Sequence, residues 1–153
     1  MSIKPSSSAL INHCEQALSE NWQFVFGAKG TRLTEQQIKA LQNRWGKINV
    51  YDSDVETKGG HICCDCSGLI SSLTGIVRNS QGYFNSAIVI KSIDERDFTM
   101  TGWAVWKRNH IGVYDGNDGY YAMDNSDRNM VHNNLNQNSF THIIKLCDIN
   151  YGK

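Results

Sequence analysis

Cys66 and His110 are the two residues whose types and surroundings best suit catalysis. A cysteine attacks as its thiolate, and a free thiol with a pKa of about 8.5 supplies little thiolate at neutral pH. A helix N-terminus beside the sulfur and an imidazole that takes its proton both correct this. Cys66 precedes Leu69, Ile70 and Leu73, which recur at helical spacing. We therefore expect the sulfur at the N-terminus of a short helix, where backbone N–H groups can also bind an oxyanion.

The residues around Cys66 suit a peptide substrate. Ser67 and Gly68 follow it directly and Asp65 precedes it. Small side chains would let a substrate approach the sulfur closely. We therefore predict that Asp65, Ser67 and Gly68 line the substrate site.

His110 opens a segment with the alternation of a β-strand, HIGVY. Alternation places His110 and Gly112 on one face and Ile111 and Val113 on the other. We expect the apolar face to pack on the core and the imidazole to point outward, over a glycine that leaves room. In this arrangement Cys66 is the nucleophile and His110 is its base.

These segments resemble a known family. CDCSGLISSL resembles the nucleophile motif of the NlpC-type papain-like cysteine peptidases, and HIGVYDGNDG resembles the strand and turn that carry their histidine. WQFVFGAKG is similar to the aromatic and glycine stretch before the nucleophile, and FTHIIKLCDINY is similar to the tail of phage endolysins of this group. The resemblance covers the chain from Trp22 to Tyr151.

The resemblance implies a papain-like α+β fold and a hydrolase of bacterial peptidoglycan. Its substrate would be a stem peptide, often cut between D-glutamate and the following diamino acid, through an acyl-enzyme on Cys66. Cleavage of the N-acetylmuramoyl-L-alanine bond is an alternative, because the same sulfur chemistry serves either amide. An acyltransferase or a deamidating toxin on the same scaffold is another, and a non-catalytic binding module is a third.

Two positions depart from the family pattern. Phe24 stands where the family usually has a tyrosine, so a hydroxyl of the substrate site is missing and Phe24 itself is expected to line that site. The residue that orients the histidine usually follows it by about a dozen positions, at Ala122 or Met123, and neither accepts a hydrogen bond. With a three-residue turn at 117–119, Asp124 lies diagonal to His110, whereas two-residue turns favour Asn125 or Asp127. We prefer Asp124 as the third catalytic residue.

The amino-acid composition limits the classes of binding partner and the cellular location that we expect. Lys plus Arg and Asp plus Glu number 15 each in 153 residues, which does not favour nucleic acid. The sequence predicts neither a signal peptide nor a membrane span, so we expect synthesis in the cytoplasm and action on the cell wall after phage lysis or specialised export, or else intracellular muropeptide recycling. Five cysteines indicate free thiols. A zinc site at His61, Cys63, Cys64 and Cys66 has poor ligand spacing, so we expect no metal and no cofactor.

The element pattern indicates one α+β domain over residues 1–153, with residues 1–7 loosely ordered. Helices are predicted from a cap at Ser8 to Asn21, from a Thr34 capping box to Gly46, and from Cys66 to Gly75. Residues 47–62 are predicted to form a loop, and the pattern of residues 80–90 is consistent with either a helix or irregular structure. From Phe98 on, alternation predicts an antiparallel meander around a turn at 116–119.

Overall fold

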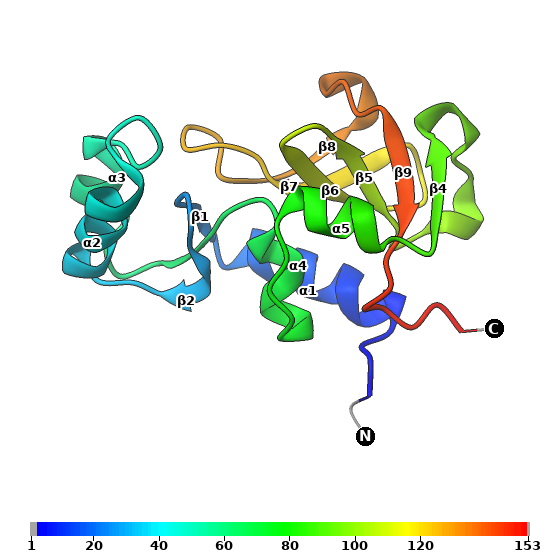
Figure 1. The fold of residues 1–153 in the computed structure, drawn as a ribbon, viewed down its shortest axis with the longest axis horizontal. Helices are drawn as coiled ribbons and strands as arrows, with labels where there is room; N and C mark the ends of the chain where they lie inside the picture. The colour runs from blue at the N-terminus through cyan, green and yellow to red at the C-terminus, as the bar shows by residue number, and fades with distance from the viewer. Residues whose placement is uncertain (1–2, 153) are drawn as a thin grey trace.

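A six-stranded antiparallel sheet packs on helices near the N-terminus in the computed structural model, which describes residues 3–152 (Figure 1). The strand order is β4-β9-β5-β6-β7-β8. The strands are β4 (Val89–Ser92), β5 (Ala104–Lys107), β6 (His110–Tyr114), β7 (Gly119–Met123), β8 (Met130–Asn134) and β9 (His142–Lys145). Strands β5 to β8 form the predicted meander, whereas β9 returns to pair with β5 and β4. The sheet follows the helical half, so the predicted α+β class with an antiparallel sheet is confirmed.

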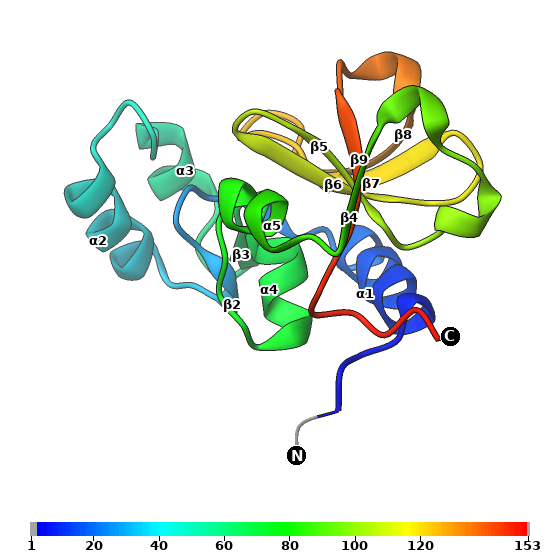
Figure 2. The same cartoon turned by 45° about the vertical axis from the view of Figure 1, so that its right-hand side comes forward.

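Five α-helices and three short 3₁₀ helices, η1 to η3, accompany the strands in the described range. Figure 2 shows α1 beneath the sheet, and Figure 1 shows α2 and α3 at the end of the molecule opposite β4. No helix among residues 3–152 combines the length and the apolar character that crossing a membrane requires. The helical elements are α1 (Ser7–Ser19), α2 (Glu35–Trp45), α3 (Asp52–Thr57), α4 (Gly68–Thr74), α5 (Ser80–Ser86), η1 (Ile93–Glu95), η2 (Phe98–Met100) and η3 (Leu135–Gln137).

The capping residues decide where the first two helices begin. The Thr34 capping box with Gln37 is present at α2, as predicted, and Gly46 ends that helix. The predicted Ser8 cap of α1 is wrong, because Ser6 Oγ accepts the Ala9 N–H at 3.0 Å. Residues 5–7, which we expected to be loosely ordered, hydrogen-bond to the backbone of Asn150. Residues 1–2 lie outside the described range.

A second, three-stranded sheet was not predicted. Its order is β1-β3-β2, with β1 (Gln23–Phe24) parallel and β2 (Lys29–Arg32) antiparallel to the central β3 (Ile62–Cys64). The strands have two to four residues, too few for a readable alternation. Likewise α3 lies in the stretch that we expected to be a loop. The small sheet matters for function because β3 ends two residues before Cys66.

Both faces of the six-stranded sheet are buried, which corrects the expected outward face of β6. Ile111 and Val113 pack with α1 and α4 in one cluster, while Tyr114 packs in a second cluster on the opposite face. Gly112 leaves no spare room, since a Cβ there would lie 2.7 Å from the carbonyl oxygen of Tyr121. Only His110, at the start of the strand, keeps partial exposure.

The turn between β6 and β7 sets the register of the catalytic candidates. Val113 lies opposite Tyr121 and Tyr114 opposite Tyr120, so five residues, 115–119, lie between the last paired residue of β6 and its partner in β7. Asp115 holds this turn by accepting the N–H groups of Asn117 and Gly119. Continuing the same register, His110 lies level with Asp124 on the same face.

Candidate active site

Cys66 lies in the turn that joins β3 to α4, two residues before the helix begins. The Asp65 carboxylate organises this turn. It accepts the Gly68 N–H at 2.7 Å and the Gly27 N–H at 3.3 Å, and both of its oxygens contact Lys29 Nζ, at 3.0 and 2.9 Å. Asp65 thus satisfies a free N–H at the start of α4 and fixes the backbone on which the sulfur sits.

The structure places the other two predicted substrate residues inside the protein. Ser67 is buried, and its hydroxyl donates to Asp65 and accepts from Lys29. Gly68 is also buried, and a Cβ there would lie 2.7 Å from the carbonyl oxygen of Ala28. These contacts explain why both residues are small: the turn packs tightly against β2 and its neighbours. The Asp65 carboxylate is likewise occupied by hydrogen bonds to groups of the protein itself.

The thiol of Cys66 is held in its protonated form in the free protein. Burial raises its pKa to about 11, and the adjacent Asp65 carboxylate acts in the same direction. Hydrogen bonds from the backbone of Ile111 and Ser67 and the charge of Lys29 act in the opposite direction without overcoming burial. The expected lowering by the helix N-terminus is therefore outweighed, and the thiol needs a base.

His110 begins β6 with its imidazole between two partners. One face of the ring stacks on Phe140, with centroids 5.5 Å apart and planes 13° apart. Its Nε2 lies 3.1 Å from Asp124 Oδ1, and the two side chains are only 12% and 8% exposed. The ring orientation is thus set by packing and by a hydrogen bond, which leaves Nδ1 for another partner.

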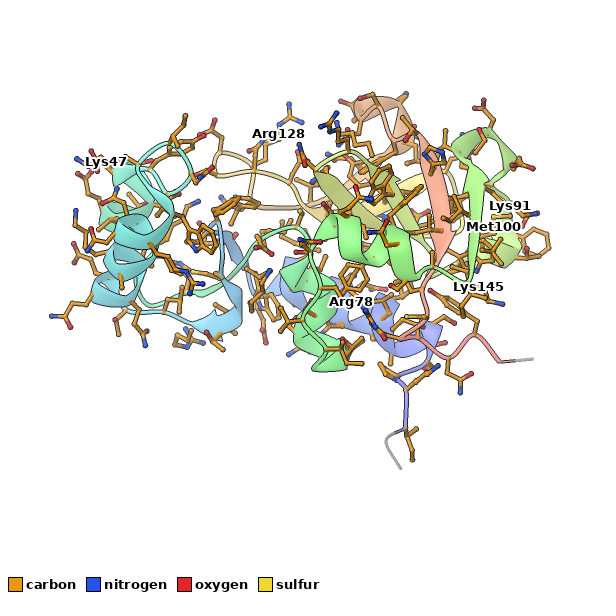
Figure 3. All side chains as sticks on the ribbon, in the orientation of Figure 1. Lys47, Arg78, Lys91, Met100, Arg128 and Lys145 are labelled. Atoms are coloured by element: carbon orange, nitrogen blue, oxygen red, sulfur yellow. The ribbon has the colours of Figure 1, made fainter. Side chains whose placement is uncertain are left out.

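Of the three candidates to orient His110, the structure brings Asp124 into contact. Asn125 Oδ1 instead accepts the N–H groups of Asp127 and Arg128 within its own turn, and Asp127 is exposed. The hydrogen bond to His110 is the largest influence that lowers the pKa of Asp124, and the charges of Arg128 and Lys107 add to it. Asp124 is accordingly an anion at neutral pH. Figure 3 shows Arg128 on the loop that follows β7.

Cys66 and His110 approach one another at the start of β6. The backbone of Ile111, the residue directly after His110, is among the groups that lower the pKa of Cys66, and Cys66 packs against the core cluster that contains Ile111. Segments more than 40 residues apart in the sequence therefore meet near the start of β6, an interior strand of the sheet. An imidazole bonded to a carboxylate lies one residue before Ile111, which suits a base and its orienting acid beside a thiol.

Phe24 lies beside β3, the strand that leads to Cys66. Its side chain is half-buried against the core cluster that includes Cys64, with which it pairs in the small sheet. Its backbone is also tied down: the N–H donates to Asn129 Oδ1 at 3.0 Å and the carbonyl accepts from Lys58 Nζ at 2.7 Å. Phe24 therefore links the nucleophile strand to the loop that carries Asp124.

The neighbouring cysteines do not converge on Cys66 as metal ligands would. Cys63 and Cys64 point to opposite sides of β3, into different core clusters, because successive strand residues alternate. Burial raises the pKa of both thiols. Between Ile3 and Gly152, no group of three or more His, Cys, Asp or Glu side chains is arranged to hold a metal ion.

Two lysines near the site were missed by sequence reasoning. Lys29 pairs with Asp65 beside Cys66, and Lys58 reaches both Phe24 and Ser126 of the loop after Asp124. Nothing in the local sequence distinguishes either from a surface lysine, since their partners lie 36 and 68 residues away. The buried Asp54 before Lys58 offered only a weak hint, as an i,i+4 ion pair.

The fold is shared with solved structures, among them a P60 domain and a peptidoglycan hydrolase. The P60 domain of antigen MAP1204 from M. avium subspecies paratuberculosis aligns with a TM-score of 0.55 at 13% sequence identity, over 93% of this chain and 97% of that chain. RipB of Mycobacterium tuberculosis, a peptidoglycan hydrolase, aligns with a TM-score of 0.52 at 16% identity, over 94% of this chain and 68% of that chain. No protein-family model and no curated protein matches the sequence. The chain has the α+β fold of these P60-type domains, as its resemblance to the NlpC-type peptidases predicted.

Proposed function

We propose that the protein is a cysteine-dependent peptidoglycan hydrolase that cuts an amide bond of cell-wall stem peptides. The observation that carries the proposal is that Cys66 packs against the cluster of Ile111, the residue directly after His110, and that His110 is bonded to Asp124. The shared fold with RipB, which is a peptidoglycan hydrolase, supports the choice of substrate. Such a substrate lies in the cell wall, where the protein would have to act.

The proposed mechanism begins with proton transfer from Cys66 to His110. With a thiol pKa of about 11, only about one sulfur in 10⁴ is ionised at pH 7, so a base must take the proton as the sulfur attacks. Because Nε2 faces Asp124, Nδ1 is the nitrogen available to Cys66. The Asp124 carboxylate stabilises the resulting imidazolium.

The remaining steps use the same groups. The thiolate adds to the amide carbonyl carbon, and His110 returns the proton to the leaving amine as the C–N bond breaks. Water, deprotonated by His110, then releases the acyl group and regenerates the thiol. Phe24 supplies no hydroxyl, so the oxyanion would rest on backbone N–H groups such as that of Cys66.

The experiment that tests the proposal is digestion of purified peptidoglycan by wild type and by Cys66→Ala. The variant should lose hydrolysis, because the nucleophile is gone, while its circular dichroism stays unchanged. Cys147→Ala is the matched control, since that cysteine lies beside Arg78 and Asp148, away from His110. Retained hydrolysis by Cys66→Ala would refute the mechanism.

Mass spectrometry of the released fragments identifies the bond. We propose cleavage between D-glutamate and the diamino acid, which leaves a dipeptide on the glycan. Release of the whole stem peptide would instead identify an N-acetylmuramoyl-L-alanine amidase. Transfer of the acyl group to an added amine, or deamidation of a protein with no action on peptidoglycan, would identify the other enzyme classes on this scaffold.

A further inference from the structure

A buried lysine joins three segments beside the proposed active site. Lys58, the residue after α3, is 4% exposed, and Asp54 is fully buried. Lys58 Nζ lies 2.8 Å from Asp54 Oδ1, 2.7 Å from the carbonyl oxygen of Phe24 and 2.9 Å from the carbonyl oxygen of Ser126. The three protons of the ammonium group therefore each have an acceptor, and each acceptor belongs to a different segment.

Ser126 belongs to the 124–129 loop, the segment between β7 and β8. Its hydroxyl lies 3.2 Å from Lys58 Nζ and donates to Asp54, so both its backbone and its side chain are held. Within the loop, the Asp124 N–H donates to the Asn129 carbonyl and the Asn129 N–H donates to the Asn125 carbonyl. The position of Ser126 is thus coupled through these loop hydrogen bonds to the position of Asp124, which hydrogen-bonds to His110.

A second contact, independent of Lys58, also joins Phe24 to the 124–129 loop. Asn129 adopts a left-handed backbone conformation, with φ of 59°, and its Oδ1 accepts the Phe24 N–H at 3.0 Å. Phe24 pairs with Cys64, two residues before Cys66. The backbone of Phe24 therefore bonds to the 124–129 loop through its N–H directly and through its carbonyl by way of Lys58.

The cost of burial argues that this arrangement has a purpose beyond packing. A buried ion pair contributes little net stability, because removing two charges from water costs several kcal/mol, and apolar residues of similar size often do as well. In some proteins such pairs are retained because they fix one geometry. Here the geometry that they fix is the distance between the nucleophile strand and the loop that carries Asp124.

We propose that Lys58, charge-balanced by Asp54, is a positioning residue that sets the His110–Asp124 pair against Cys66. This inference rests on the proposed function, in which those three residues perform the reaction. Lys58 does not touch the reacting atoms. It acts through Ser126 and Phe24, and Asn129 assists it from the loop side.

The decisive variant replaces the ion pair by neutral residues, Asp54→Asn with Lys58→Met. Changing Lys58 alone would leave a buried carboxylate without its partner and could unfold the protein. The amide oxygen that Asp54→Asn introduces can still accept the Tyr51 N–H, which Asp54 accepts at 2.9 Å, and this keeps the start of α3. Asn129→Gly is the independent second variant, because glycine adopts a positive φ without strain while losing the contact to Phe24.

Gln42→Met is the matched control. Gln42 is also buried and polar, and it bonds the Val50 carbonyl and Asp52 between α2 and α3, without reaching Phe24 or the 124–129 loop. All variants are compared with wild type on a soluble stem peptide. We expect kcat to fall on the order of 10²-fold in the double variant, with KM little changed, since misplacing a catalytic group by about 1 Å costs that much. Asn129→Gly should fall in the same direction, and Gln42→Met should keep wild-type kcat even where its melting temperature drops.

A spectroscopic readout separates failure of this inference from failure of the proposed function. In wild type, His110 Nε2–H donates to Asp124 and should give a slowly exchanging proton signal in ¹⁵N-histidine-labelled protein. The double variant and Asn129→Gly should lose that protection, and Gln42→Met should keep it. Folded double variants with wild-type kcat, or with the protected signal intact, overturn the positioning role. If wild type cleaves no peptidoglycan, the proposed function fails, and the proton signal still decides whether Lys58 positions the pair.

Discussion

His110 Nε2 lies 3.1 Å from Asp124 Oδ1 because the β6–β7 register puts these residues level with one another. Asp124→Ala should lower kcat by on the order of 10²-fold, since the imidazole loses the group that fixes its orientation. Asp124→Asn should also lower kcat, because a neutral amide cannot stabilise the imidazolium and can hold the imidazole in the wrong tautomer. Steady-state kinetics on a stem peptide measures both. Asp127→Ala, in the same loop but exposed, is the control, and equal losses in Asp124→Ala and Asp127→Ala would contradict the assignment.

The same contact predicts a pH dependence of stability. The hydrogen bond from His110 is the main cause that depresses the pKa of Asp124 in the folded state, whereas the unfolded carboxyl titrates near about 3.9. The carboxylate therefore contributes stability above its unfolded pKa, and that contribution disappears as pH falls through the lower folded pKa. The difference in unfolding free energy between wild type and Asp124→Asn should be largest near neutral pH and shrink below about pH 4. Urea titrations at several pH values measure it, and a difference that grows toward low pH would be the wrong sign.

The pH dependence of Cys66 alkylation by iodoacetamide should show whether His110 acts as its base. In His110→Ala the thiol keeps only its own environment, whose burial raises the pKa to about 11. Its alkylation rate should then rise about tenfold per pH unit from neutral pH to near pH 10, without levelling off at the pKa of about 8.5 of a free thiol. Wild type should react faster than His110→Ala at pH 7. Identical profiles for the two proteins would show that His110 takes no proton from Cys66.

Lys29 should influence the nucleophile through Asp65. Its ammonium neutralises the carboxylate beside the sulfur, and its charge lowers the pKa of Cys66. Lys29→Met should therefore slow alkylation at fixed pH and reduce kcat several-fold, because the thiolate then faces an unbalanced anion. Lys47→Met is the control, since Lys47 forms an exposed ion pair with Asp52 in the segment between α2 and α3 (Figure 3). Equal effects from the two substitutions would point to net charge.

Gly68 should tolerate no side chain. A Cβ would lie 2.7 Å from the Ala28 carbonyl oxygen and 3.0 Å from Cys64 Cβ, so the turn that carries Cys66 would have to move. Gly68→Ala should lower the unfolding free energy by about 1–3 kcal/mol and reduce kcat as well. Urea denaturation and kinetics measure the two effects. A stable, fully active variant would show that this packing does not position the nucleophile.

The sequence by itself determined the elements whose signals are local. The Thr34 capping box, the apolar spacing after Cys66 and the alternation from His110 each lie within one element, and each predicted its helix or strand. The choice of Cys66 and His110 followed from the same segments. The short strands β1 to β3 and helix α3 could not be predicted, because two to six residues carry too little periodicity.

The tertiary structure decided what depends on distant contacts. Asp124 was selected among three candidates because the turn after Tyr114, held by Asp115, fixes the register of β7. Burial made the Cys66 thiol a weak acid, against the lowering that a helix N-terminus alone would give. Lys58 acquired its place only when folding brought Phe24 and Ser126 within hydrogen-bonding distance, from 34 and 68 residues away. Contacts at such separations depend on packing and register, which no local pattern encodes.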